Sequence, residues 1–251
     1  MTKIYWAGDS TVQYNDITTY PYAGIGQAMH LFCKPNVEIV NRARNGRSTK
    51  SFMDEGRLAL IDAVISEGDF FFIQFGHNDE KINDPSRYTE PYSTFQDNLR
   101  IYIDVARNKG AWPVLITPLE RRFFAEDGKL TKGEHGDYVA GMKQVAAKEN
   151  VPLIDLNAMS RQEMEKAGPE GTKRWFVHVP AGIYPYCPEG KADNSRLQYA
   201  GAVVFAGCIA RGLKELGGVY ADLLVDWGEN DAQGQSKEAQ FLNDSNTAVI
   251  R

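Results

Sequence analysis

Short apolar segments alternate along the chain with longer amphipathic ones. The apolar runs are rich in β-branched and aromatic residues and predict five β-strands. They lie at 4–7, 37–40, 70–73, 113–117 and 152–156. Segments with apolar residues at helical spacing lie at 21–33, 51–67, 92–109, 135–149 and 200–216. Continuous apolar strands separated by helices are typical of a parallel sheet covered on both faces, so the pattern predicts a three-layer α/β domain.

The chain beyond residue 216 does not continue this pattern. An apolar run at 221–225 is followed by a polar stretch at 229–235, which has little with which to build a core. We therefore divide the chain into a main domain, 1–216, and a C-terminal extension, 217–251. The extension either stays solvated or docks on the main domain or on a second copy of the chain. Its candidate docking residues are Val219, Tyr220, Leu223, Leu224 and Trp227.

Composition narrows the class of protein. The 251 residues are 43% apolar and 24% charged, as in ordinary soluble globular proteins. The formal net charge of −5 argues against a general phosphate-binding surface, so nucleic acid is not an expected partner. No apolar run approaches the about 18 residues of a membrane span, and the first strand begins too close to Met1 for a signal peptide. We expect a cytoplasmic protein with no membrane partner, although a secreted protein without its leader would look the same.

Signals for a metal, a disulfide or a cofactor are missing from the sequence. The cysteines Cys33, Cys187 and Cys208 are odd in number and have no CxxC spacing, which disfavours a disulfide framework and a zinc site. No glycine-rich phosphate loop opens a helix, which disfavours a phosphate-binding flavodoxin-like module. We expect free thiols, no metal and no cofactor.

Polar blocks follow several of the predicted strands. In an open parallel sheet, ligands bind beyond the carboxyl ends of the strands. The blocks lie at 8–11, 41–48, 76–79 and, before the last helix, 193–196. We expect all four on one rim of the sheet.

Ser10 is a candidate nucleophile, because a serine on a tight turn after a strand projects its hydroxyl from the rim. A serine that only caps the turn has the same local sequence. The amides of Ser10 and Gly46 and the side-chain amide of Asn78 can together form an oxyanion hole. Taken singly, Gly46 also fits a loop turn, Asn78 a cap, and His77 a hydrogen-bonded rim histidine.

In combination, these blocks resemble those of the SGNH (GDSL) hydrolases and, more narrowly, the rhamnogalacturonan acetylesterases. The narrower resemblance extends over about residues 3–216 and rests on segments 8–12, 46–52, 74–79, 117–122, 135–138, 193–195, 197 and 201–202. It implies a flavodoxin-like fold with a central parallel five-stranded sheet. It also implies a serine esterase that removes acetyl groups from plant cell-wall polysaccharide, of the rhamnogalacturonan (pectin) or xylan type.

The resemblance also implies catalytic roles, position by position. Ser10 is the nucleophile; Ser10, Gly46 and Asn78 form the oxyanion hole; Asp193 is the acid of the triad. The family's base is a histidine three residues after that aspartate, and this chain has Arg196 there. A guanidinium has a pKa above about 12 and no acceptor lone pair, so it cannot take the serine proton.

Without its base, a Ser-His-Asp unit typically loses about four to six orders of magnitude in rate. His135 and His178 lie in loop-like regions that can approach the pocket, which leaves a relocated base open, whereas His77 is expected to orient the rim. We therefore expect an acetylesterase of little or no activity. The alternative is an inactive carbohydrate-binding or sensing protein, in which Arg196 pairs with Asp193 and binds acetate or a carboxylate.

Signals for substrate contacts are weaker. Rhamnogalacturonan is acidic, so local basic groups such as Arg42, Arg44 and Arg47, or Arg121 and Arg122, would steer it, although surface arginines with acidic partners look the same. The aromatic segment 175–186 offers stacking faces for sugars or packs to hold itself down. The candidate substrate-binding residues are Asp9, His77, Arg47, Arg122 and Trp175. The expected partners are an acetylated oligosaccharide or polysaccharide and, through the extension, a second copy of the chain in a homodimer.

Overall fold

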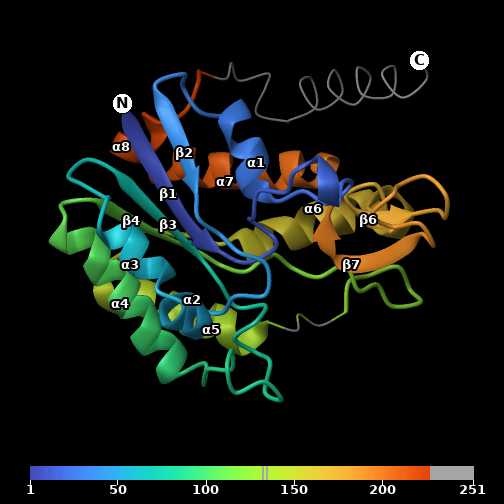
Figure 1. Cartoon of the computed structure of the whole chain (residues 1–251), viewed down its shortest axis with the longest axis horizontal. Coiled ribbons are helices and arrows are strands. Elements are labelled where there is room, and N and C mark those ends of the chain that lie inside the picture. The colour runs from blue at the N-terminus through green and yellow to red at the C-terminus, as the bar shows by residue number, and fades with distance from the viewer. Residues whose placement is uncertain (132, 134, 227–251) are drawn as a thin grey trace.

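A five-stranded parallel sheet forms the centre of the molecule (Figure 1). The computed structural model describes residues 1–131, 133 and 135–226. The strands are β1 (Thr2–Gly8), β2 (Val37–Asn41), β3 (Phe70–Gln74), β4 (Trp112–Ile116) and β5 (Leu153–Ile154). They lie in the order β2-β1-β3-β4-β5, with Trp6 paired to Asn41 and Gly8 to Gln74. The predicted five-stranded parallel sheet is confirmed.

Helices cover both faces of this sheet, as Figure 1 shows. One face packs against α2 (Thr49–Asp54), α3 (Arg57–Asp62), α4 (Thr94–Asn108) and α5 (Gly136–Glu149). The other packs against α1 (Ile25–Ala28), α6 (Leu156–Gly171), α7 (Tyr199–Leu216) and α8 (Gly218–Ala221). Phe71 and Ile73 of β3 point to the first layer, and Phe70 and Phe72 to the second. Because both faces are buried, the strands read as continuous apolar runs.

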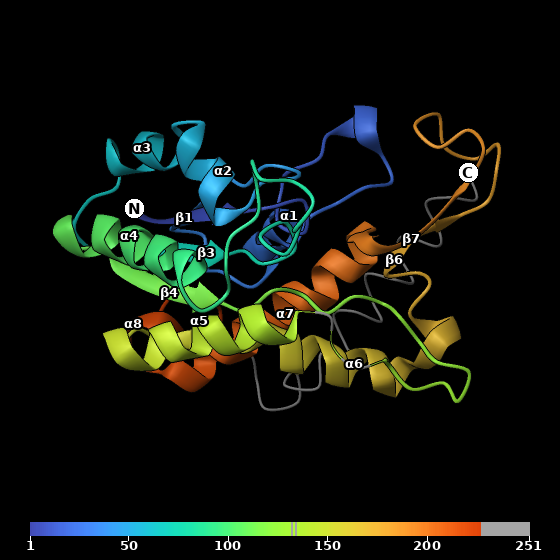
Figure 2. The same ribbon diagram turned by 90° about the horizontal axis from the view of Figure 1, so that it is seen from below.

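The structure differs from the predicted elements in several places, among them the predicted helix at 51–67, which is two short helices, α2 and α3. β6 (Phe176–Val179) and β7 (Lys191–Leu197) form a separate antiparallel hairpin, at the end of the molecule toward which β1 runs (Figure 2). Helix α6 was not predicted and is broken at Gly168 and Pro169. The predicted helix at 21–33 is only α1 and the 3₁₀ turn η2 (Met29–Leu31), after the turn η1 (Ile17–Thr19). The first residues of this predicted helix are extended instead, because Ala23 and Ile25 hydrogen-bond to Leu197 and Thr11.

Part of the C-terminal extension packs on the main domain. Leu223 and Leu224 are buried in the core layer that contains α7, and the Tyr220 ring lies edge-on to Phe70 at 5.7 Å between centroids. Val219 is 40% exposed and does not belong to this contact, contrary to expectation. The fifth candidate, Trp227, and the rest of the extension lie outside the described residues.

The described residues contain no helix with the length and apolar character to cross a membrane. In the same part of the chain, no group of three or more His, Cys, Asp or Glu side chains is placed to hold a metal ion. The cysteines are buried free thiols, as expected.

Candidate active site

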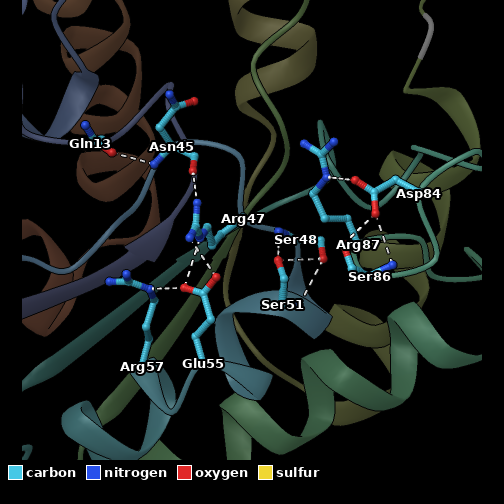
Figure 3. Close-up of polar contacts among 10 residues, drawn as sticks. All are labelled: Gln13, Asn45, Arg47, Ser48, Ser51, Glu55, Arg57, Asp84, Ser86 and Arg87. Atoms are coloured by element: carbon cyan, nitrogen blue, oxygen red, sulfur yellow. Dashed lines mark hydrogen bonds and ion pairs between the residues drawn. The ribbon is translucent and has the colours of Figure 1, made fainter.

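The turn that carries Ser10 adjoins the turn that carries Gly46. Ser10 lies two residues after the end of β1. The amide of Asn45, after β2, donates a 2.5 Å hydrogen bond to Oε1 of Gln13 (Figure 3). Gly46 has a φ of 78°, a left-handed conformation that glycine adopts without the strain of a Cβ. The two predicted backbone donors therefore belong to adjoining turns at the carboxyl edge of the sheet, near the point where the strand order reverses.

Asn78 lies in the loop after β3 and contacts the turn that carries Gly46. We call the place where the loops of Ser10, Gly46 and Asn78 meet the corner. The Asn78 Nδ2 donates to the carbonyl of Arg47 at 3.1 Å, and the Asn78 Oδ1 accepts from Nη1 of Arg87 at 3.3 Å. Because its nitrogen has an acceptor and its oxygen has a donor, the orientation of the Asn78 side-chain amide is defined. Among the described residues, the second Nδ2 hydrogen has no acceptor. The structure thus brings the loops of Ser10, Gly46 and Asn78 together, which is the arrangement that an oxyanion hole requires.

Asp79 fixes the Asn78 loop to the start of α2. Its Oδ1 accepts from the amide and the hydroxyl of Thr49, at 3.0 and 2.6 Å, and from the hydroxyl of Thr89 at 3.0 Å. Its Oδ2 is buried and has no partner among the described residues. Burial raises the pKa of Asp79 to about 7, against the lowering effect of the Thr49 donors. This buried carboxyl holds the loop from beneath and does not face a ligand.

Asp9 and His77, predicted as substrate contacts, are also buried beneath the site. Oδ1 of Asp9 accepts from the amide and hydroxyl of Thr11, at 2.9 and 2.8 Å, and burial raises the pKa of this carboxyl. Nε2 of His77 lies 2.8 Å from the carbonyl of Leu119. Burial, followed by the charge of His135, holds the pKa of His77 well below its usual value. Both side chains are bonded to the loops of the site in this structure, and their contact with a substrate stays a prediction.

No hydrogen bond joins a histidine to Ser10 among the described residues. Each imidazole has its hydrogen-bond partner elsewhere. The partners are the Gln27 carbonyl for His30, the Leu119 carbonyl for His77, Glu80 for His135 and Asn194 for His178. Across residues 1–131, 133 and 135–226, no hydrogen bond reaches the Ser10 hydroxyl. Nε2 of His135 is buried without a partner among the described residues, and a relocated base at His135 or His178 stays an open alternative.

Asp193 and Arg196 form an ion pair within β7. Nη1 of Arg196 lies 2.9 Å from Oδ2 of Asp193, whose Oδ1 accepts from the amides of Ser195 and Arg196 at 2.9 and 3.0 Å. Burial pushes the pKa of Asp193 up, but these donors outweigh it, and the pKa lies below its usual value. The carboxylate is therefore ionised, and its partner is a guanidinium that offers no lone pair for a proton.

A short bridge places the end of β7 beside the Ser10 turn. The amide of Ala23 donates to the carbonyl of Leu197 at 2.9 Å, and the amide of Ile25 donates to the carbonyl of Thr11 at 2.8 Å. These are the residues that were expected to begin a helix. They instead connect β7, the strand of the Asp193–Arg196 ion pair, to Thr11, which follows Ser10.

Two other predicted substrate contacts lie in the interior. Arg122 is 7% exposed and donates through all three nitrogens. Its acceptors are the Thr172 hydroxyl, Asn194 Oδ1 and the Pro169 carbonyl. Trp175 is 5% exposed and packs edge-on against Phe205 at 5.9 Å between centroids. Both side chains are buried in this structure, and their contact with a sugar stays a prediction.

Arg47 lies at the rim, and each nitrogen of its guanidinium has a partner. Nε and Nη2 contact the two carboxylate oxygens of Glu55 at 3.0 and 2.7 Å, and Nη1 donates to the carbonyl of Asn45 at 2.8 Å (Figure 3). Arg57 shares the same carboxylate at 2.6 Å. The alternative of a surface arginine with an acidic partner therefore describes Arg47 best.

Arg87 is a residue of this corner that the sequence did not single out. Besides its bond to Asn78, its Nη1 would lie 3.8 Å from a Cβ placed on Gly46. It belongs to a turn eight residues beyond the Gly-His-Asn-Asp block, where no motif marks it. Only the fold brings its guanidinium to the site.

Comparisons with known proteins agree with this arrangement. A model of the GDSL-like Lipase/Acylhydrolase family matches residues 7–179. Rhamnogalacturonan acetylesterase RhgT of Bacillus subtilis is 42% identical over 225 residues, which are 89% of this chain and 94% of the relative. The probable rhamnogalacturonan acetylesterase YesY of the same bacterium is 43% identical over 215 residues, 85% and 93% of the two chains.

Among solved structures, protein YXIM of Bacillus subtilis aligns with a TM-score of 0.73 at 29% identity, over 86% of this chain and 57% of that one. The described fold therefore recurs in a known structure. With a family model that spans most of the main domain and two relatives that match over nearly their full length, the chain belongs to the GDSL-like lipase/acylhydrolase family, as its motifs predict.

Proposed function

We propose that this protein is a serine acetylesterase for plant cell-wall polysaccharide whose turnover is impaired by Arg196. The two Bacillus subtilis relatives favour the rhamnogalacturonan type of substrate over the xylan type. Ser10 supplies the nucleophile, and the corner of Ser10, Gly46 and Asn78 supplies donors for an oxyanion. The ion pair of Asp193 with Arg196, at the position of the triad base, carries the proposal of impairment.

In the complete reaction, Oγ of Ser10 attacks the acetyl carbonyl carbon while its proton passes to a base. The developing oxyanion accepts hydrogen bonds from the amides of Ser10 and Gly46 and from Nδ2 of Asn78. The sugar oxygen then leaves as an alcohol with that proton, and water hydrolyses the acetyl-enzyme by the same route. Every step uses a proton acceptor at Ser10, and Arg196 is not one. The chain therefore keeps oxyanion stabilisation, worth about 10³–10⁴ over water together with binding, and lacks proton transfer.

Replacement of Arg196 by histidine tests the proposal. Arg196→His should raise kcat/KM for p-nitrophenyl acetate by at least about a thousandfold, because it supplies the missing acceptor next to Asp193. Ser10→Ala in that background should abolish the gain.

Arg211→His is a matched control. Arg211 also pairs with a carboxylate, Glu163 at 2.7 Å, but lies on α7 away from the hairpin. It should bring no gain in activity. A folded Arg196→His protein, checked by circular dichroism, that is no faster than the starting protein would contradict the proposal.

The exposure of Arg196 favours a second function. Its side chain is 41% exposed and holds Asp193 through Nη1, so the rest of the guanidinium can bind an acetate or carboxylate group. The protein would then bind acetylated oligosaccharide without hydrolysing it. Calorimetry with acetylated and deacetylated oligosaccharide distinguishes the two functions: binding that requires the acetyl group and disappears in Arg196→His, with no gain of turnover, would favour the binding protein.

A further inference from the structure

Arg87 presents a fixed cation beside the corner of Gly46 and Asn78. Its Nε donates to Oδ2 of Asp84 at 2.6 Å and its Nη1 to Oδ1 of Asn78 at 3.3 Å. The Arg87 side chain is 32% exposed. Figure 3 shows its terminal nitrogens extending beyond the Asp84 carboxylate. Two bonds thus hold the guanidinium while one edge of it remains open to solvent.

The turn that carries Arg87 is itself well anchored. Asp84 accepts from the amide and hydroxyl of Ser86, at 3.1 and 2.5 Å, and its carbonyl accepts from the amide of Arg87 at 3.0 Å. Nζ of Lys50, on α2, donates to the Pro85 carbonyl at 2.6 Å. A cation held this way loses little conformational entropy when it binds a ligand.

Arg87 has one terminal nitrogen without a partner in the described structure, whereas every nitrogen of Arg47 has one. Arg47 contacts Glu55 and Asn45 through all three of its nitrogens. In the part of the chain that the structure describes, Nη2 of Arg87 and one hydrogen of its Nη1 have no acceptor. These are the donors that a planar carboxylate matches.

The segment that carries Gly46 is positively charged although the whole chain is negative. Residues 42–57 contain five basic and two acidic side chains, whereas the formal net charge of the protein is −5. Lys50 of this segment lies against the Arg87 turn. A local excess of positive charge attracts anionic groups to this edge of the site.

We propose that Arg87 binds the carboxylate of an acidic sugar while the acetyl carbonyl of that sugar lies in the Gly46–Asn78 corner. The inference rests on the proposed function for the acetyl group and goes further, because it assigns the residue that recognises the charge of the substrate. A uronic acid carries both substituents on one ring or on adjacent rings, so one site can hold both. A neutral acetylated sugar would leave the open edge of Arg87 to water.

Binding to the unaltered chain tests this inference without any turnover. The probes are an oligogalacturonate of defined length and its methyl ester, which replaces each carboxylate by a neutral ester group, measured by calorimetry at low salt. The acidic oligomer should bind more tightly than the ester. Arg87→Gln should lower the affinity for the acidic oligomer by roughly tenfold and leave the affinity for the ester unchanged. Arg100→Gln is the matched control, because Arg100 also pairs with an aspartate three residues away, Asp97 at 2.7 Å, but lies on α4; it should change neither affinity.

A turnover experiment in the Arg196→His background separates this inference from the proposed function. Arg87→Gln should lower kcat/KM on acetylated oligogalacturonate by roughly tenfold more than on the methyl ester of the same oligomer, because any change at Asn78 affects both substrates alike. Equal affinity of the unaltered chain for the two oligomers, or an equal loss of both in Arg87→Gln, would overturn the inference. An inactive Arg196→His protein that still binds by charge through Arg87 would instead overturn the proposed function alone.

Discussion

Two fully buried carboxyl groups, Asp9 and Asp79, lie under the candidate active site. Their donors are the amides and hydroxyls of threonines, and no described salt bridge involves either carboxylate. Burial raises the pKa of both groups, to about 7 for Asp79, because the charged form loses its solvation by water. The residues that shape the site are therefore sensitive to pH in a range where an ordinary aspartate is not.

Stability should fall as pH rises toward neutrality because of Asp79. The unfolded chain releases this proton at about pH 4 and the folded chain at about pH 7, so between these values the folded state binds the extra proton. The free energy of unfolding should decrease across this window and level off above it. In Asp79→Asn the decrease should be smaller, by up to about 1 kcal/mol per pH unit. Urea unfolding of both proteins at several pH values in this window measures the difference, and parallel curves would contradict it.

Among the elements, α7 packs against the start of the hairpin through a glycine. A Cβ on Gly201 would lie 2.2 Å from the carbonyl oxygen of Trp175, whereas a Cβ on Gly207 of the same helix would lie 3.4 Å from the Phe32 ring. The first distance is impossible without moving the backbone, and the second is an ordinary contact. The two glycines of one helix therefore have opposite roles.

Alanine at these two positions should have opposite effects. Gly201→Ala should lower the free energy of unfolding by about 3 kcal/mol, at the upper end of overpacking penalties. Gly207→Ala should be neutral or raise it by up to about 1 kcal/mol, because alanine is the better helix former. Urea unfolding decides, and equal stabilities would show that the backbone at Trp175 adapts to the added methyl group.

Among the elements, the sequence predicted the strands of the sheet and most helices. Strands buried on both faces are continuous apolar runs, and helices buried on one face have apolar residues at helical spacing. It did not predict β7, whose polar residues form a strand only by pairing with β6. It also placed Trp175 and Arg122 at the surface, since their burial depends on distant segments that close over them. The motif blocks located the loops of the candidate site, but Arg87 has no local signal and is found only from the fold.

For the molecule as a whole, the described part of the extension completes the core. Leu223 and Leu224 are 3% and 5% exposed, and the amide of Lys34 donates to the Leu223 carbonyl at 2.9 Å. Burial of a leucine side chain stabilises a fold by about 1.5–3 kcal/mol. The boundary at 216, which rested on composition, therefore falls before residues that the main domain uses.

Two truncations should separate the parts of the extension. A chain ending at 226 should keep the Tm of the full chain to within about 1 °C, whereas one ending at 216 should lose about 3 kcal/mol or more and unfold several degrees lower. Thermal unfolding measures this. Light scattering at matched concentration then tests the proposed homodimer, which should weaken when residues 227–251 are removed. A large drop in Tm for the chain ending at 226 would contradict the assignment.

The hairpin that carries Asp193 is held by hydrogen bonds of the next residue, Asn194. Oδ1 of Asn194 contacts His178 Nε2 and Arg122 Nη1, at 2.8 and 2.9 Å, so the strand keeps its place without help from the side chain at 196. That side chain is 41% exposed, whereas the loops of Ser10 and Asn78 rest on buried groups. Position 196 can therefore change at little cost in folding. A single nucleotide converts some arginine codons into histidine codons. Under the proposed function, one such change would turn the impaired protein into an active hydrolase, and the reverse change would remove that activity, with a folded product on both sides.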